Sequence, residues 1–365
     1  MKVAIIGCGQ IADAHASQIR RIPDCEIVGV CDRELLMAKQ FADRFQVKRY
    51  FDDASALLET TKPDVVHITT PPQSHFNLAE LCLDAGCCVY VEKPFTLNSE
   101  EAARLIRKAE ESGRKITVGH NLQFSPVARQ MRALIKDGYL GGDPVHMESY
   151  YGYELGDVRY AKALLADKNH WVRTLPGKLL HNIISHGISK IAEFLPDEDP
   201  LVIVHGFRSP VMKSINETDI IDEVRVIIDD TGVTAYFTFS TQISPKMRLF
   251  RIYGPENALV IDEDHQTILK HRGYSYKSYL NQLVPPAALA KQFMANSCHN
   301  VIRFITRELH TSIGLKCLIE FFYDSIKQDS PEPIPYREIL LTTRIMDKVF
   351  EQVNKQIDTE VFVEV

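Results

Sequence analysis

The chain of 365 residues is 45% hydrophobic and 25% charged, a composition typical of a globular protein that is too long for one ordinary hydrophobic core. Its 42 basic and 48 acidic residues give a net charge of −6, which provides no general attraction to nucleic acid. We therefore expect two domains and no nucleic-acid partner.

The sequence also lacks the features of secreted and membrane proteins. Its eight cysteines form no CxxC pair and do not have the density of a disulfide scaffold, so we expect reduced thiols. There is no signal-peptide pattern and no run of about 18 or more apolar residues. These observations predict a cytoplasmic, soluble protein with no membrane partner. We also expect no metal site.

In the first 120 residues, short strand patterns alternate with helical patterns. The predicted strands cover 3–7, 26–31, 64–69, 88–92 and 116–119. The predicted helices between them cover 11–22, 34–45, 54–59, 74–85 and 99–112. Such alternation is typical of an α/β fold with a doubly wound parallel sheet. We therefore predict that residues 1–122 form a domain of this kind.

The pattern changes after residue 120. Helices are predicted at 124–136 and 180–195, a strand at 145–153, and further strands at 201–207, 223–229, 233–240, 248–254, 258–262 and 266–271. A helical tail follows from about residue 286 and is interrupted at 330–335. Short connections between strands favour an open, mostly antiparallel sheet. Residues 123–365 are thus predicted to form an α+β domain for substrate binding and oligomerisation, and its exposed strand faces predict a homo-oligomer, a dimer or tetramer.

The first strand leads directly into the segment Gly7-Cys8-Gly9-Gln10-Ile11-Ala12, which then opens a helix. This is G-x-G-x-x-A at the position of a dinucleotide-binding turn. Gly7 permits the turn, Gly9 lets the backbone approach a pyrophosphate, and Ala12 allows close packing, while the helix start, including Gln10 and Ile11, offers N–H groups to the anion. We predict that these residues bind the cofactor.

Asp32 ends the second strand, 20 residues after Ala12. A carboxylate at this point accepts hydrogen bonds from the ribose hydroxyls of NAD and repels the 2′-phosphate of NADP. The neighbouring Arg33 acts in the opposite sense, because a guanidinium can hold that phosphate. We predict NAD as the cofactor, with NADP as the alternative.

The strand at 64–69 ends in Thr69, and Thr70, Pro71 and Pro72 follow it. Two consecutive prolines cannot continue a central strand, so the backbone leaves the sheet at its carboxyl edge. We predict that Thr69, Thr70 and Pro71 line the nicotinamide part of the site. His75 is included with the cofactor-binding residues, although local packing or capping is the stronger interpretation of this histidine alone.

The strand at 88–92 ends in Glu92-Lys93-Pro94, which delivers two titratable groups to the same sheet edge. In open parallel sheets, ligands bind beyond the carboxyl ends of the strands. Lys93 is therefore the first catalytic candidate, and Glu92 is expected to set its position or pKa. The alternative is an ordinary solvated turn.

Several pieces in one order resemble the glucose-fructose oxidoreductase, inositol dehydrogenase and MocA (Gfo/Idh/MocA) family. They are the glycine turn, Asp32, Thr-Pro-Pro with His75, Glu92-Lys93-Pro94, Gly119-His120-Asn121, and Phe124 with Pro126. The resemblance implies a Rossmann domain, an open-sheet domain and redox chemistry with NAD or NADP on a sugar, cyclitol or nucleotide-linked sugar. It also implies that Lys93 contacts both cofactor and substrate.

The resemblance also implies a catalytic role for His186, while Asn182 stands where the family usually has an aspartate. Asn182, Ser185, His186 and Ser189 form one helical stripe, which suits either a cleft or a solvated face. We expect His186 to handle the substrate proton and Asn182 to bind a substrate hydroxyl. Further predicted substrate contacts are His120, Asn121, His170, Trp171 and Arg173.

Trp171 either stacks on a sugar ring or packs in the core, and Arg173 with Lys178 is a weak match to a nucleotide diphosphate. Two alternatives to a freely exchanging dehydrogenase stay open. One is a sensor that binds the cofactor without turnover, and the other is a redox enzyme that retains and recycles its NAD.

Overall fold

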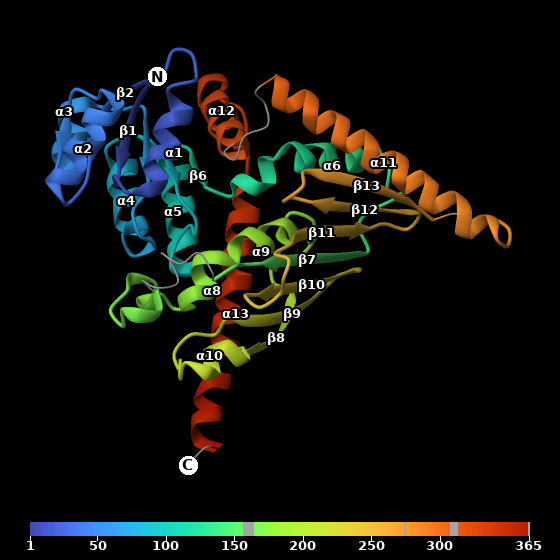
Figure 1. Ribbon diagram of the computed structural model, residues 1–365. Helices are drawn as coiled ribbons and strands as arrows, with labels where there is room; N and C mark the ends of the chain where they lie inside the picture. Colours follow the sequence, from blue (N-terminus) through green and yellow to red (C-terminus); the bar gives the residue numbers. More distant parts are fainter. Residues whose placement is uncertain (156–163, 274, 307–312, 364–365) are drawn as a thin grey trace. The chain divides into compact units, whose positions relative to one another are not determined.

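The computed structural model describes residues 1–155, 164–273, 275–306 and 313–363, with side chains described as far as residue 356 (Figure 1). The chain divides into two compact units. The first contains Met1–Asn121 and Gly314–Arg344, and the second contains Leu122–Ile313 and Ile345–Val365. No helix in the described ranges is both long enough and apolar enough to cross a membrane.

The first unit is built on a six-stranded parallel sheet with the order β3-β2-β1-β4-β5-β6. The strands are β1 (Lys2–Ile6), β2 (Glu26–Cys31), β3 (Tyr50–Phe51), β4 (Val65–Ile68), β5 (Cys88–Val91) and β6 (Ile116–Val118). The strand order reverses at β1, which lies between β2 and β4. In doubly wound folds this switch point is where the ligand crevice forms, beyond the carboxyl ends of the strands.

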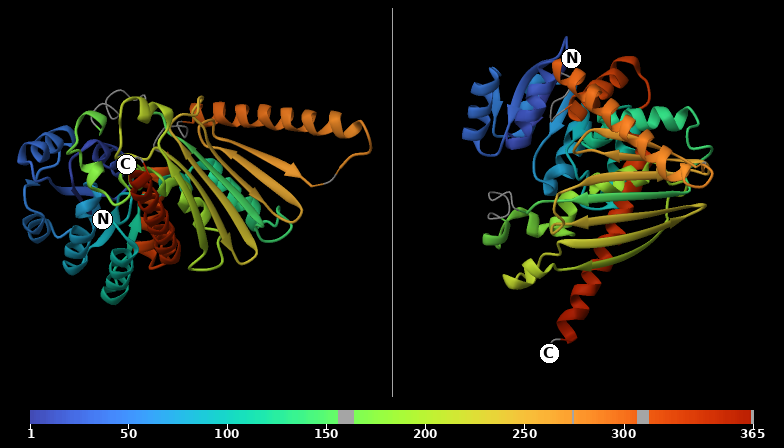
Figure 2. Two further views of the ribbon diagram at one scale, coloured as in Figure 1. Left: turned by 90° about the horizontal axis from the view of Figure 1, so that it is seen from below. Right: turned by 45° about the vertical axis from the view of Figure 1, so that its right-hand side comes forward.

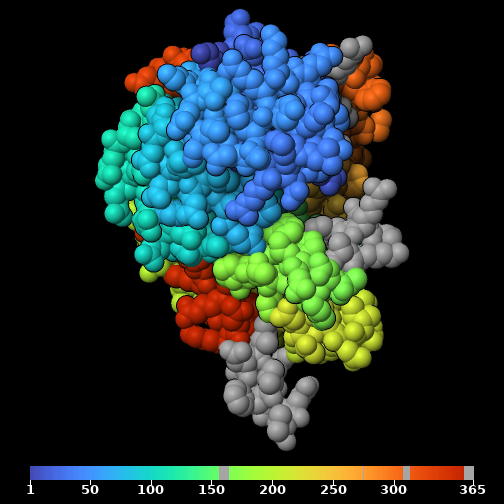
Figure 3. Space-filling view, turned by 90° about the vertical axis from the view of Figure 1, so that its left-hand side faces the viewer, coloured from blue at the N-terminus to red at the C-terminus, as the bar shows by residue number. Residues whose placement is uncertain are grey.

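Helices follow the strands much as the sequence predicts. They are α1 (Gln10–Ile19), α2 (Leu35–Phe45), α3 (Ala54–Thr61), α4 (His75–Asp84) and α5 (Ser99–Ser112), with a short 3₁₀ turn η1 (Pro72–Ser74). The side of this unit that carries α2, α3 and α4 faces the viewer in Figure 3. Of the six strands in this sheet, the sequence prediction missed β3, because two residues at a sheet edge carry no periodic signal.

Part of the helical tail, Gly314–Arg344, belongs to the first unit, whereas the sequence predicts one continuous domain over 123–365. Helix α12 (Ile313–Gln328) buries Phe322 and Tyr323, and the Tyr323 hydroxyl is 2.8 Å from Nε2 of His67 on β4. Lys115 Nζ donates to the carbonyl of Ser330 at 2.7 Å. An apolar stripe predicts that a helix is buried but does not identify the core that receives it.

The second unit holds a seven-stranded sheet with the order β13-β12-β11-β7-β10-β9-β8. Only β7 and β10 pair in parallel, and all other pairs are antiparallel, as predicted. The strands are β7 (His146–Gly152), β8 (Leu201–Phe207), β9 (Glu223–Asp230), β10 (Val233–Ser240), β11 (Arg248–Tyr253), β12 (Asn257–Asp262) and β13 (Thr267–Arg272). The helical segments are η2 (Asn121–Phe124), α6 (Pro126–Lys136), η3 (Trp171–Thr174), α8 (Lys178–Ile183), α9 (Ser185–Ala192), α10 (Pro210–Ser214) and α11 (Leu280–Ile305). Helix α13 (Tyr336–Val363) belongs to this unit from Ile345 onward.

Amide side chains from two helices cover both edges of this sheet. On the β13 edge, Gln292 of α11 pairs with the backbone N–H and C=O of Lys270, and Asn296 pairs with those of Ile268. Figure 2 shows α11 running alongside β13. On the β8 edge, Gln352 and Gln356 of α13 make the same kind of contact. These amides occupy edge groups that would otherwise be open to another strand.

The predicted single helix 180–195 is two helices, because the chain bends at Ile184 between α8 and α9. The polar stripe expected there is therefore divided. Ser185 and Ser189 are buried, whereas Asn182 and His186 are half-buried. Gly187 permits close packing of α9 on β10, since a Cβ atom there would lie 2.2 Å from the ring of Phe237.

Candidate functional site

The glycine turn between β1 and α1 has the backbone that a dinucleotide site needs. Gly7 has a φ of +95°, and a Cβ atom on it would lie 2.8 Å from the backbone of Thr69 and Thr70. Gly9 is exposed, and a Cβ atom on it would meet nothing within 4 Å. No side chain caps the N-terminus of α1. The turn thus leaves helix N–H groups and open space for an anion, which fits the pyrophosphate of a dinucleotide.

Gln10 and Ile11, the next two residues of the turn, are exposed, whereas Ala12 is fully buried. The motif therefore exposes Gln10 and Ile11 to solvent and packs Ala12 in the core of the unit. Asp32 holds the turn in place. Its Oδ2 accepts from the backbone N–H of Cys8 at 2.7 Å, and its Oδ1 accepts from that of Glu34 at 3.0 Å. Each carboxylate oxygen keeps a lone pair for a further donor, as ribose binding requires. Arg33 is exposed beside it.

The loop after β4 lies against the glycine turn. Thr69 Oγ1 donates to the carbonyl of Gly7 at 2.6 Å, and Ser74 Oγ donates to Oγ1 of Thr70 at 2.7 Å. Pro71 is exposed next to them. These contacts keep the predicted nicotinamide-side residues next to the turn that is predicted to bind the phosphates.

His75 is buried and bridges two loops, in agreement with local packing, the stronger of its two interpretations from the sequence. Its Nδ1 is 2.9 Å from the carbonyl oxygen of Pro94, and its Nε2 is 2.9 Å from that of Thr70. Both ring nitrogens are therefore occupied by the loops that follow β4 and β5. We assign His75 to positioning those loops.

Three titratable side chains gather at the carboxyl ends of β5 and β6. Glu92 is buried, and its Oε2 accepts from the backbone N–H of Lys93 at 3.1 Å. Gly119 leaves room for this carboxylate, since a Cβ atom there would lie 2.8 Å from its Oε1. Burial lowers the pKa of the Lys93 ammonium, and the charge of Glu92 acts in the opposite direction. A half-buried amine with a reduced pKa is typical of a functional lysine.

His120 completes this group. Burial lowers its pKa to about 4, although Glu92 opposes the shift, so its imidazole is neutral at neutral pH. The neighbouring Asn121 has a buried amide oxygen for which the described part of the chain offers no hydrogen-bond partner. A buried acceptor without a partner suits contact with a ligand hydroxyl.

Asn182, the predicted hydroxyl-binding residue, lies on α8, and His186, the predicted proton-handling residue, lies on α9. The His186 ring stacks on Tyr151 of β7, with centroids 5.9 Å apart and planes 11° from parallel. Asn182 lies at the last turn of α8 and is half-buried. Lys93 and His186 belong to different units. Their joint action on one substrate stays a prediction.

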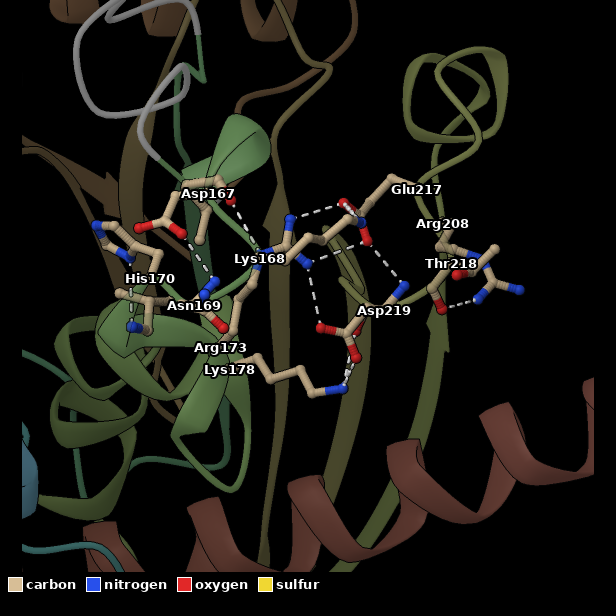
Figure 4. Close-up of polar contacts among 12 residues, drawn as sticks. Asp167, Lys168, Asn169, His170, Arg173, Lys178, Arg208, Glu217, Thr218 and Asp219 are labelled. Atoms are coloured by element: carbon tan, nitrogen blue, oxygen red, sulfur yellow. Dashed lines mark hydrogen bonds and ion pairs between the residues drawn. The ribbon is translucent and has the colours of Figure 1, made fainter.

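Arg173, a predicted substrate contact, is engaged in an ion network. Its guanidinium is buried, with Nη2 2.8 Å from Glu217 Oε2, Nη1 3.1 Å from Asp219 Oδ2, and Nε 3.0 Å from the Leu164 carbonyl (Figure 4). Lys178 pairs with the same Asp219. Both cations that were matched to a diphosphate are thus satisfied by carboxylates of the chain. A substrate contact of Arg173 stays a prediction.

His170 and Trp171 lie at the start of η3, beside this ion network. The His170 side chain accepts from the backbone N–H of Val172, and its ring stacks on that of Trp171 with centroids 5.7 Å apart. Both residues are half-buried, so each keeps an exposed part that a substrate can contact.

Sequence reasoning missed His15 and His67. His15 contacts Glu92 from the buried side of the site, and His67 contacts His15. His15 Nε2 is 2.9 Å from Glu92 Oε1, and both histidines are fully buried. A signal was available, because His15 interrupts the apolar face that Ala12, Ala16 and Ile19 form on α1. Among the residues that the structure describes, no group of three or more His, Cys, Asp or Glu side chains is placed to hold a metal ion.

Comparisons with known proteins agree with this geometry. Residues 1–120 match a family described as an oxidoreductase family with an NAD-binding Rossmann fold, GFO_IDH_MocA. A D-glucoside 3-dehydrogenase of Escherichia coli is 35% identical over 142 residues, 39% of this chain and 40% of that protein. A UDP-N-acetylglucosamine 3-dehydrogenase of Acidithiobacillus ferrooxidans is 34% identical over 132 residues, 36% of this chain and 41% of that protein. The matched parts therefore span less than half of these two relatives.

The similarity of fold extends over nearly the whole chain. The crystal structure of an NAD binding oxidoreductase from Klebsiella pneumoniae superposes with a TM-score of 0.78 at 20% identity, covering 98% of this chain and 97% of that one. At this level of identity the match demonstrates a shared fold for both units.

Proposed function

We propose a function for this chain from the family that its residues 1–120 match, the Gfo/Idh/MocA oxidoreductases with an NAD-binding Rossmann fold. The function is NAD(P)-dependent transfer of hydride to or from a hydroxyl-bearing carbon of a sugar, cyclitol or nucleotide-linked sugar. The observation that carries it is the group formed by Glu92, Lys93 and His120 at the carboxyl edge of the first sheet. That group lies at the same sheet edge as an uncapped glycine turn that suits a dinucleotide.

Each residue of the site has a role in this proposal. The glycine turn holds the pyrophosphate and Asp32 holds the ribose hydroxyls, which favours NAD over NADP. NAD, when bound, supplies the hydride acceptor or donor. Lys93 donates a hydrogen bond to the substrate oxygen and stabilises developing alkoxide charge. His186 takes up or returns the proton of that oxygen.

The substrate class is narrowed by the second unit. Because Arg173 and Lys178 are already paired with carboxylates, they do not support recognition of a diphosphate. The names of the two relatives, one a glucoside dehydrogenase and one a nucleotide-sugar dehydrogenase, leave both kinds of sugar in the proposal. We favour a sugar or cyclitol without a diphosphate, held by Asn121 and Asn182 through its hydroxyls.

The experiment is turnover of Lys93→Ala with NAD across glucosides, cyclitols and nucleotide sugars. General acid–base and electrostatic help is typically worth about 10² to 10⁴ in rate, so we expect kcat to fall by at least about 100-fold. Lys39→Ala, which removes an exposed lysine of α2, is the matched control and should keep full activity. Turnover of Lys93→Ala within twofold of the unmodified protein would refute the assignment.

Asn182, in place of the aspartate usual in the family, favours a second candidate, a sensor that binds the cofactor without turnover. NADH binding without any redox change across the same substrates supports the sensor. A third possibility is that NAD is retained and recycled within each turnover. Denaturing the purified protein and measuring released NAD(H) distinguishes this possibility from the other two.

A further inference from the structure

A buried chain of hydrogen bonds leads from the candidate site into the core of the first unit. His15 Nε2 lies 2.9 Å from Glu92 Oε1, His15 Nδ1 lies 2.8 Å from His67 Nδ1, and His67 Nε2 lies 2.8 Å from the Tyr323 hydroxyl. His15, His67 and Tyr323 are all 0% exposed. This chain of hydrogen bonds joins α1, β4, α12 and the residue that follows β5. The proposed reaction does not use it directly.

When both imidazole rings are neutral, the hydrogen bonds of this network have a single direction. An ionised Glu92 only accepts, so His15 donates from Nε2. A neutral His15 then has a bare Nδ1, which accepts from Nδ1–H of His67. The bare Nε2 of His67 in turn accepts from the Tyr323 hydroxyl. Burial lowers the pKa of His67 well below its usual value, in agreement with a neutral ring. Every donor therefore points toward the Glu92 carboxylate.

We infer that the chain Tyr323–His67–His15 is a positioning device that keeps Glu92 ionised and oriented beside Lys93. This inference rests on the proposed role of Lys93. With Oε1 held by His15, Oε2 is the oxygen that accepts from the Lys93 backbone. Burial alone raises the pKa of Glu92, but the hydrogen bond from His15, the charge of Lys93 and the hydrogen bond from the Lys93 backbone outweigh burial, so the pKa is below its usual value.

Other groups face the same carboxylate and belong to the argument. From β5, Tyr90 lies close enough for the charge of Glu92 to add to the burial that raises its pKa. His75 on α4 and His120 after β6 also face Glu92, whose negative charge raises the pKa of each histidine. Burial has the larger effect and keeps both pKa values below the usual value. The hydrogen bonds given to the carboxylate oxygens come from His15 and from the Lys93 backbone. Loss of the His15 side chain should therefore remove the hydrogen bond that most directly opposes the increase in the Glu92 pKa caused by burial.

The structure supplies a matched control for the far end of the chain. Tyr90 is fully buried, and its ring stacks on His67 with centroids 4.7 Å apart. Its hydroxyl has no hydrogen-bond partner within the described ranges. Tyr323→Phe and Tyr90→Phe thus remove one buried hydroxyl each from the same cluster, but only Tyr323→Phe shortens the hydrogen-bond chain.

The experiment titrates Lys93 directly in the full-length protein. Lysines are labelled by reductive ¹³C-methylation, the Lys93 signal is identified by its loss in Lys93→Arg, and its chemical shift is followed with pH by NMR. In His15→Leu, Glu92 loses its donor and becomes protonated, so Lys93 loses a neighbouring negative charge. Since an opposite charge at close range shifts a pKa by about 1 to 3 units, we expect the Lys93 pKa to fall by about one unit or more.

Three further variants complete the test. His15→Gln keeps a neutral donor and should restore most of the unmodified titration. Tyr323→Phe should give a smaller fall, and Tyr90→Phe none. The limb of the pH–rate profile that reports Lys93 should move to lower pH in the same order. Lys93 titrating identically in Tyr323→Phe and Tyr90→Phe would overturn the inference even if His15→Leu fails to fold.

The two proposals fail in different ways. A shifted Lys93 titration in a protein without turnover rejects the oxidoreductase function and keeps the positioning device. Normal turnover of the unmodified protein, with a Lys93 titration that the substitutions leave unchanged, keeps the oxidoreductase function and rejects the positioning device.

Discussion

The Arg173 guanidinium lies against Glu217 and Asp219. These contacts lower the pKa of Glu217 and so make the stability of the fold depend on pH. Burial raises the pKa of Glu217, but the hydrogen bonds from Arg173 and from the Asp219 backbone outweigh it and bring the pKa to about 2. A carboxylate whose folded-state pKa lies below the usual 4.5 stabilises the fold above pH 4.5. That contribution is lost as the pH falls from 4.5 toward 2.

Glu217→Gln should therefore destabilise the second unit at pH 7 and flatten its pH dependence below pH 4.5. Removing one partner of a buried ion pair costs about 3 kcal/mol or more. Denaturant unfolding followed by the fluorescence of Trp171, the single tryptophan, measures the change near the site. Asp13→Asn, which breaks the exposed pair with Arg44, is the control and should cost less than about 1 kcal/mol. Equal losses in the two variants would contradict the interpretation.

At the scale of elements, amide side chains of α11 and α13 protect the edges of the seven-stranded sheet. Gln352 and Gln356 are one helical turn apart, so their spacing matches alternate residues of β8, namely Val202, Val204 and Gly206. Each glutamine both donates to and accepts from the strand. The helix thereby acts as a substitute for an eighth strand.

The double substitution Gln352→Leu and Gln356→Leu should leave these backbone groups unsatisfied at a buried edge. Each such group costs about 1 to 3 kcal/mol, so we expect a lower thermal midpoint and aggregation through β8. Thermal unfolding with light scattering measures both effects. Lys355→Leu adds an apolar side chain to an exposed position of the same helix and serves as the control. Aggregation of the control to the same extent would point to surface hydrophobicity as the cause.

At the scale of the whole molecule, one face of the second sheet carries exposed apolar side chains. Ile203, Ile227 and Tyr236 are cross-strand neighbours on β8, β9 and β10, and they are 52%, 45% and 50% exposed. Contiguous exposed apolar side chains on a sheet are typical of an interface. We propose that this face joins copies of the chain in a homo-oligomer.

Ile203→Asp combined with Ile227→Asp should convert the oligomer to monomers, because a C2 interface repeats each buried charge on both subunits. Size-exclusion chromatography with light scattering measures the mass. Leu36→Asp, at a 64% exposed position of α2 in the first unit, is the control and should leave the mass unchanged. An unchanged mass in the double variant would place the interface elsewhere.

Much of this protein is determined by local sequence. The bounds of β2, β8, β10 and α5 match their predictions exactly in residue number, because period, turn residues and caps act over a few positions. Asn98 caps α5 by accepting from the backbone N–H of Glu101, and Gly113 ends that helix with a φ of +63°. The glycine turn, Asp32 and Lys93 were predicted for the same reason, since each follows directly from a strand end.

Only the tertiary structure decided which side chains meet. Glu92 and His15 are 77 residues apart in the chain, and His67 and Tyr323 are 256 apart, so no local pattern links them. The same holds for the ion pair that occupies Arg173, for the loops bridged by His75, and for the return of Gly314–Arg344 to the first unit. Local sequence sets the conformation of the backbone through short-range sterics and hydrogen bonds, whereas the partner of a buried polar side chain depends on how distant elements pack.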